Sequence, residues 1–298
     1  MKNSLPKIHG HRGARGRRPE NTLNAVKFAI DSGADGVEVD LCVTADNIVV
    51  LHHDLALSPS IAIDIDGNRI TTSCAIRTQP YTELLHYDVG QLDKNSAYGQ
   101  KFPQQLACPG TSVPTLEMFI QYVLDHGSAG TVFNLELKGS PDRAELLPEP
   151  INYVKLVADQ IKRHGIASRT FIQSFDWALV RLMREELPEI TTGVLTDMQP
   201  NGDPRIPLPG VISEWTDNMI LDTFNGSVPR MVAASSADVW SSNFRDLTPE
   251  LVTEAKNLGL DVYVWTVNDC ADMEAMIAMG VDVITTDYPD RLLSLGTL

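Results

Sequence analysis

Short apolar, β-branched runs alternate with amphipathic stretches along most of the 298-residue chain. Runs of this length are typical of strands, and apolar residues three or four apart are typical of helices. The pattern predicts strands over residues 7–11, 35–41, 48–53, 131–138, 170–174, 191–195, 237–241, 261–266 and 282–286. Strands that alternate with helices indicate a parallel sheet with right-handed crossovers, either open or closed into a barrel.

Several helix boundaries are marked by residues that favour helix ends. Thr115, Asp176 and Thr248 are expected to be N-caps, and Thr248 precedes a proline, which is favoured at the first helical position. Gly33 and Gly259 are expected to end the first helix and the helix that follows Thr248. No G-x-G-x-x-G segment opens a helix after a strand, so a dinucleotide-binding fold has no support.

Two segments interrupt the alternation. Residues 55–113 are polar and rich in turn residues, and within them residues 61–72 predict a hairpin around Asp66-Gly67. Residues 198–210 contain four prolines, which predicts a loop. We expect one domain over residues 1–298, with residues 55–113 as an insertion within it.

Composition excludes some classes of partner. The formal net charge of −15 argues against nucleic acid, because nucleic-acid-binding proteins usually present a basic face. No run approaches the roughly 20 apolar residues of a membrane helix, so stable membrane insertion is not expected. The first ten residues lack a signal-peptide core, so a cytoplasmic protein is expected, or a periplasmic or secreted one if a leader was removed. The oligomeric state is left open.

Positive charge is concentrated near the start of the chain. Residues 2–18 contain six lysines and arginines and no acid. Such a cluster on an acidic protein could receive one small anion. The alternative is that Arg15, Arg17 and Arg18 form a solvated surface run.

Polar residues alternate with apolar ones on two predicted strands. Glu38 and Asp40 share one face of the second strand, and Asn134, Glu136 and Lys138 share one face of the fourth. Apolar faces pack against helices, so the polar faces should point inward, where isolated charges are costly. A hard divalent cation such as calcium or magnesium best explains three inward carboxylates. The alternative is a structural ion pair between Glu38 and Lys138.

Histidines lie at the ends of two predicted strands. His11 follows the first strand, and His52 and His53 end the third. Imidazoles titrate near neutrality and could serve as general acid and base. Alternation alone does not choose between His52 and His53, and it does not exclude His9.

A series of motifs spanning residues 7–292 resembles the glycerophosphodiester phosphodiesterase family. The motifs, in chain order, are His11-Arg12-Gly13, Pro19-Glu20-Asn21-Thr22, Gly33-Ala34-Asp35-Gly36-Val37-Glu38-Val39-Asp40, His53-Asp54, Val113-Pro114-Thr115-Leu116-Glu117, Asn134-Leu135-Glu136-Leu137-Lys138, Gln173-Ser174-Phe175, Val264-Trp265-Thr266-Val267-Asn268, Gly280-Val281-Asp282 and Thr286-Asp287-Tyr288-Pro289. Each motif is weak alone, but the ordered combination is specific. The resemblance implies an α/β fold, a (β/α)8 TIM barrel with its site at the carboxyl ends of the strands.

The resemblance also implies roles for individual residues. It implies that His11 and His53 are the acid–base pair of a metal-dependent hydrolase that cleaves glycerophosphodiesters to glycerol 3-phosphate and an alcohol. One divalent cation, Ca²⁺ or Mg²⁺, would be held by Glu38, Asp40 and Glu136. The phosphate of a small-molecule diester would be held by Arg12 and Lys138.

The resemblance also implies supporting roles for residues around the site. Glu20 and Asn21 would brace the first loop, and Asp54 would orient His53 or a neighbouring loop. Trp265 would form a wall of the pocket or part of the barrel core.

The chain departs from the family pattern after His53-Asp54. Members often continue with a segment like Leu-x-Arg-Thr-Thr, whereas this chain continues Leu55-Ala56-Leu57-Ser58-Pro59-Ser60. Because this arginine is absent, the resemblance does not define the structure of the pocket for the leaving group. Two other functions compete: a phospholipase D-like enzyme acting on lysophospholipids or sphingomyelin, and a non-catalytic anion-binding barrel.

Overall fold

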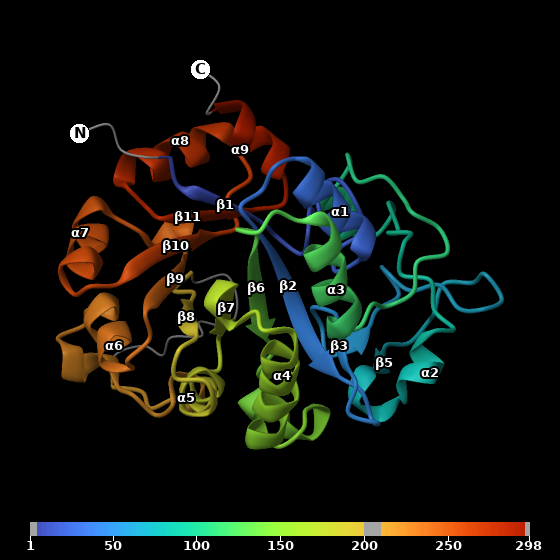
Figure 1. Cartoon of the computed structure of the whole chain (residues 1–298), viewed down its shortest axis with the longest axis horizontal. Coiled ribbons are helices and arrows are strands. Elements are labelled where there is room, and N and C mark those ends of the chain that lie inside the picture. Colours follow the sequence, from blue (N-terminus) through green and yellow to red (C-terminus); the bar gives the residue numbers. More distant parts are fainter. Residues whose placement is uncertain (1–4, 200–209, 296–298) are drawn as a thin grey trace.

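The computed structural model describes residues 5–199 and 210–295, and in these residues eight parallel strands close into a barrel (Figure 1). The strands are β1 (Lys7–Gly10), β2 (Gly36–Val43), β6 (Val132–Leu137), β7 (Thr170–Ser174), β8 (Thr191–Thr196), β9 (Val239–Asn243), β10 (Asp261–Trp265) and β11 (Val283–Thr286). Pairing of β1 with both β11 and β2 closes the ring. The predicted TIM barrel is therefore confirmed, and most of the predicted loop at 198–210 lies outside the described residues.

Helices cover the outside of the barrel (Figure 1). They are α1 (Leu23–Asp31), α3 (Leu116–His126), α4 (Pro150–His164), α5 (Trp177–Glu186), α6 (Val228–Ala234), α7 (Pro249–Asn257), α8 (Cys270–Met279) and α9 (Pro289–Leu295). The side chains of Thr115, Asp176 and Thr248 each accept a hydrogen bond from a backbone amide in the first turn, which confirms the predicted N-caps. None of the helices within the described ranges combines the length and apolar character needed to cross a membrane.

The third predicted strand does not belong to the parallel set. It is β3 (Val49–Leu51), which pairs antiparallel with β2. The connection between Val43 and Val49 is too short for the crossover of a dozen or more residues that a parallel pair needs. As a result the chain returns along β2, and the backbone amide of His52 donates to the carbonyl of Asp40 at 3.0 Å.

Residues 55–113 pack beside the β2–β3 hairpin, outside the ring of strands (Figure 1). They contain the two-residue strands β4 (Ala56–Leu57) and β5 (Cys74–Ala75) and the short helix α2 (Tyr81–Leu84). Their buried apolar side chains form a cluster separate from the main core. The predicted hairpin at 61–72 is reduced to a single bridge between Ile63 and Arg69.

Register between β2 and β6 positions the acids. Asp40 lies opposite Glu136, and Glu38 lies opposite Asn134. The alternate residues of both strands are fully buried apolar side chains of the main core: Val37, Val39, Leu41, Phe133, Leu135 and Leu137. Because successive side chains point to opposite faces, the acids point into the barrel.

Candidate active site

A pocket of about 240 Å³ opens at the carboxyl ends of the barrel strands. Six of the eight residues that the sequence singles out lie in its wall: His11, Arg12, Glu38, His53, Glu136 and Trp265. Asp40 and Lys138 join the same cluster through ion pairs with Arg12 and Glu136. A larger hollow between α6 and α7 lies on the outer helices, away from these groups.

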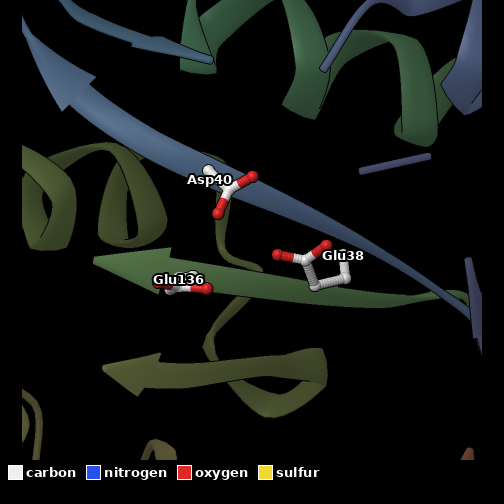
Figure 2. Close-up of side chains that lie close together, drawn as sticks. All are labelled: Glu38, Asp40 and Glu136. Atoms are coloured by element: carbon white, nitrogen blue, oxygen red, sulfur yellow. The ribbon is translucent and has the colours of Figure 1, made fainter. Parts of the chain in front are cut away.

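Glu38, Asp40 and Glu136 converge from two neighbouring strands. Figure 2 shows Glu38 and Asp40 on β2 and Glu136 on β6. One carboxylate oxygen from each lies within 4.8 Å of the others, and all three side chains are buried. Glu38 Oε2 accepts from the backbone amide of Arg12 at 2.7 Å. Within the described part of the chain, Glu38 Oε1 has no hydrogen-bond partner.

Each acid is in a different electrostatic environment. Burial, with the charges of Asp40 and Glu136, raises the pKa of Glu38 well above its usual range. Burial also raises the pKa of Glu136, although Lys138 opposes this shift. Burial likewise favours a higher pKa for Asp40, but the positive charges of Lys138 and Arg12 outweigh it and hold that pKa well below its usual range.

This set of donors fits a divalent cation. Three buried carboxylates supply hard oxygen ligands, and the unpartnered Oε1 of Glu38 is free to coordinate. Repulsion among the acids would be relieved by a central positive charge. The cluster could therefore bind a divalent metal, and its chemistry does not distinguish calcium from magnesium.

Lys138 does not form the ion pair with Glu38 that the sequence left open. Its Nζ lies 2.5 Å from Glu136 Oε1 and 3.4 Å from Asp40 Oδ1. Arg12 lies on the other side of Asp40, with Nε 3.3 Å from Asp40 Oδ2. Two cations thus flank Asp40, which explains why its carboxyl keeps a low pKa.

A carboxylate orients the imidazole of His11 by hydrogen-bonding to its Nδ1 atom. Its Nδ1 lies 2.7 Å from Asp287 Oδ1, and its Nε2 lies 3.9 Å from Glu38 Oε2. Arg15 donates to both carboxylate oxygens of Asp287, and so holds Asp287 as an anion. Burial and the charge of Arg15 lower the pKa of His11 to about 4, although Asp287 opposes them.

His53 is held in a similar way by the residue that follows it. Its Nδ1 lies 2.7 Å from Asp54 Oδ1. Burial and the charges of Arg12 and Lys138 lower the pKa of His53 to about 4. Its side chain is 34% exposed, so water screens part of these effects.

The other two candidate histidines lie off the pocket. His52 is buried, with Nδ1 2.8 Å from the carbonyl of Asp54. His9 is buried inside the barrel, where it contacts Asn134 and the edge of Tyr263. The structure therefore brings His11 and His53, and neither His9 nor His52, into the wall of the pocket.

Aromatic side chains also line the pocket. Trp265 and Phe175 meet edge to face with ring centroids 5.4 Å apart, and both line the pocket. Trp265 is half-buried, and its Nε1 donates to the carbonyl of Ser241 at 3.2 Å. Of the two placements that the sequence left open, Trp265 takes the pocket wall.

Several residues of the site were not assigned from the sequence. Asp287 belongs to the motif Thr286-Asp287-Tyr288-Pro289, but nothing in the local sequence pattern links it to His11. Arg15 is not the solvated surface residue that the sequence left open: it lies in the pocket wall with its side chain only 11% exposed. Arg17 pairs with Asp290, and Arg18 lies over the ring of Phe28.

A (β/α)8 barrel with acids, histidines and arginines converging at the carboxyl ends of its strands defines a barrel enzyme. The chain belongs to the Glycerophosphoryl diester phosphodiesterase family, whose model matches residues 11–291. The resemblance inferred from the motifs is therefore confirmed, and it covers nearly the whole chain.

Individual relatives match over nearly their full lengths. A protein from Caldanaerobacter subterraneus named glycerophosphodiester phosphodiesterase is 28% identical over 97% of this chain and 96% of its own. A solved structure of the same family from Silicibacter pomeroyi has 33% identity and a TM-score of 0.85, covering 98% of this chain and 95% of that one. A phosphodiesterase from Oleispira antarctica, solved with sn-glycerol-3-phosphate, has 22% identity and a TM-score of 0.70, covering 99% and 98%, and shares the fold.

Proposed function

We propose that this protein hydrolyses glycerophosphodiesters to glycerol 3-phosphate and an alcohol, with the help of one divalent cation. The observation that carries the proposal is the convergence of three buried carboxylates and two histidines around one pocket. Membership of the family supports the substrate class. The product bound to the Oleispira antarctica relative is consistent with glycerol 3-phosphate as a product here.

Glu38, Asp40 and Glu136 would hold the cation, Ca²⁺ or Mg²⁺. When bound, such an ion neutralises charge on phosphate oxygens and stabilises the charge that develops in the transition state. Arg12 adds a fixed guanidinium beside the same cluster, and Lys138 adds an ammonium. Both cations would help to hold the phosphate of the diester.

His11 and His53 would form the acid–base pair. One neutral imidazole takes the proton of the glycerol 2-hydroxyl, whose oxygen then bonds to phosphorus. The other imidazole, protonated, gives its proton to the departing alcohol oxygen as the ester bond breaks, which leaves a cyclic phosphate. Water then opens the ring with the roles exchanged. Hydrogen bonds from Nδ1 to Asp287 and Asp54 leave the Nε2 atoms for this work.

A substrate panel with metal control tests the proposal. Glycerophosphocholine, glycerophosphoethanolamine and lysophosphatidylcholine are offered to the enzyme after EDTA treatment and after Ca²⁺ or Mg²⁺ is restored. We expect loss of activity with EDTA, recovery with a cation, and faster cleavage of the glycerophosphodiesters. Faster cleavage of lysophosphatidylcholine would favour the phospholipase D-like alternative. Absence of metal-stimulated cleavage of any diester would favour the anion-binding barrel.

A further inference from the structure

A stretch of the 55–113 segment, the 98–106 strap, lies against the loop that follows β1. Gln105 Nε2 donates to the carbonyl of Arg15 at 2.8 Å, and the amide of Leu106 donates to the carbonyl of Arg17 at 2.9 Å. The guanidinium of Arg15 lies over the ring of Phe102, 4.5 Å from its centroid. The strap therefore contacts both the backbone and the side chains of the loop that carries the arginines of the pocket.

The strap is itself held in shape. Lys94 Nζ donates to three of its backbone carbonyls, those of Phe102, Pro103 and Gln105, at 3.2, 3.2 and 2.7 Å. The rings of Tyr98 and Phe102 meet edge to face with centroids 5.4 Å apart. A strap fixed at several points can hold a side chain in one place with little entropic cost on binding.

Tyr98 brings its hydroxyl into the arginine cluster. The hydroxyl donates to Glu20 Oε2, while Nη1 of Arg15 and Nη1 of Arg12 donate to it at 3.2 and 3.4 Å. Glu20 Oε1 accepts from Nη1 of Arg12 at 2.7 Å. A hydroxyl has one proton to donate and two lone pairs to accept with, so all its hydrogen-bonding capacity is used.

Charge fixes the direction of these bonds. Burial and the nearby charge of Glu20 raise the pKa of Tyr98, so the phenol keeps its proton. Burial favours a higher pKa for Glu20, but Arg12, Arg15 and the phenol outweigh it and hold that pKa below its usual value. Glu20 therefore stays an acceptor, and Tyr98 stays its donor.

We propose that Tyr98 is a positioning residue of the phosphate site: its hydroxyl holds Glu20 between Arg12 and the strap, and so sets where the Arg12 guanidinium meets the substrate. The 55–113 segment would thus contribute to phosphate binding without lining the pocket. This inference rests on the proposed function, because it takes Arg12 as a phosphate-binding group.

Tyr98→Phe is the direct test, because it removes the hydroxyl and keeps the ring beside Phe102. We expect the KM for glycerophosphocholine and the Kd for glycerol 3-phosphate, measured by calorimetry, to rise by about 5- to 20-fold. This is less than the direct loss of a hydrogen bond to a charged group, because Tyr98 acts on the substrate only through Arg12. kcat should change by less than about 3-fold, since no proton-transfer group is altered.

Two further variants separate positioning from folding. Tyr81→Phe removes another hydroxyl of the same segment, one that donates to the carbonyl of Val113, and should leave KM and Kd unchanged. Tyr98→Ala should lower both melting temperature and affinity. Tyr98→Phe should have the melting temperature of the wild type, unlike Tyr98→Ala, but should keep the lowered affinity.

Three outcomes decide the matter. Wild-type KM and Kd in a folded Tyr98→Phe protein would overturn the proposal. A lower melting temperature with unchanged affinity would assign Tyr98 a purely structural role and would overturn it as well. A wild-type protein that binds glycerol 3-phosphate but cleaves no diester would refute the proposed function, while the calorimetric comparison would still decide the role of Tyr98.

Discussion

Glu38 combines complete burial with a carboxylate oxygen that has no hydrogen-bond partner in the described residues. Its pKa is raised in the folded protein, chiefly by burial. Its contribution to stability is therefore present below the unfolded pKa of about 4.3 and is lost as pH rises through the folded pKa. A neutral residue of the same shape, such as glutamine, does not ionise and so avoids this loss of folding stability at high pH.

Glu38→Gln should consequently stabilise the metal-free protein at pH 7 while it abolishes activity. We expect the free energy of unfolding in EDTA to rise by about 1–3 kcal/mol, measured by urea denaturation. Glu117→Gln, at a half-exposed glutamate paired with Arg163 and His164, should stay within about 0.5 kcal/mol of wild type. A destabilised but metal-responsive Glu38→Gln protein would contradict the assignment of Glu38 as a ligand.

His53→Ala should lower kcat by about 10²–10⁴-fold, because general acid–base catalysis contributes that order of rate. The side chain is partly exposed, so the fold should persist, and circular dichroism would check this. His86→Ala, at an exposed histidine of the 55–113 segment, is the matched control and should retain full turnover. Near-normal turnover in folded His53→Ala would remove His53 from the mechanism.

His9 should make the protein less stable in mild acid. Burial and the charge of Lys7 lower its pKa to about 3, whereas the unfolded chain binds a proton near pH 6.5. Stability is therefore lost as pH falls below 6.5, by about 2 kcal/mol at pH 5. Urea denaturation of wild type and His9→Asn at pH 7.5 and 5 should show the smaller decrease in the variant, and equal decreases would disprove the prediction.

At single positions, the sequence predicted which residue types would form the site more readily than which side chains would reach the pocket and which partners they would contact. Strand alternation placed Glu38, Asp40 and Glu136 on inward faces, because the two-residue period is local. The choice between His52 and His53 required the family resemblance, since both follow one short strand. The partnership of His11 with Asp287 joins residues 276 positions apart, and only the closed barrel brings them together.

At the scale of elements, the β2–β3 hairpin has a function of its own. β2 continues past the barrel rim, and β3 returns beside it to deliver His53 to the pocket. Alternation correctly predicted a strand near residues 48–53 but said nothing of its direction. The antiparallel direction of β3 follows from the short turn before it, because that turn has too few residues for the crossover connection that a parallel strand needs.

A cation that bridges β2 and β6 should stabilise the folded protein. Ligands on both strands must be folded to bind together, so binding contributes about 2.7 kcal/mol at a free concentration of 100 times Kd. We expect the melting temperature to rise with added Ca²⁺ or Mg²⁺ and to return with EDTA. Asp40→Asn should remove the response, whereas Asp125→Asn, at an exposed residue of α3, should preserve it. An equal response in both variants would place the cation elsewhere.

At the scale of the whole molecule, the buried apolar side chains of the described residues form two separate clusters. One fills the space between the barrel and its helices, and the smaller one underlies the 55–113 segment. That segment has only two-residue strands and one four-residue helix as regular structure besides 3-10 turns. Little regular structure and a small core predict a low free energy of local opening.

Native-state hydrogen exchange should therefore detect two levels of opening. We expect amides of the 55–113 segment to exchange through an event of lower free energy than those of β2, β6 and β7. Leu84→Ala, in the smaller cluster, should accelerate exchange in that segment and leave the barrel strands largely unchanged. One common free energy for both regions would show that they unfold as a single unit.

The sequence alone determined the parallel α/β architecture, the helix caps and the inward acids, because each depends on residues close together in the chain. The family motifs added closure of the barrel and the choice of His53. Tertiary structure decided the rest: the pairing of His11 with Asp287, the ion pair of Arg15 with the same carboxylate, and the approach of Tyr98 to Glu20. These contacts join segments far apart in sequence, and their geometry exists only once the strands have closed and the 98–106 strap has packed against the first loop.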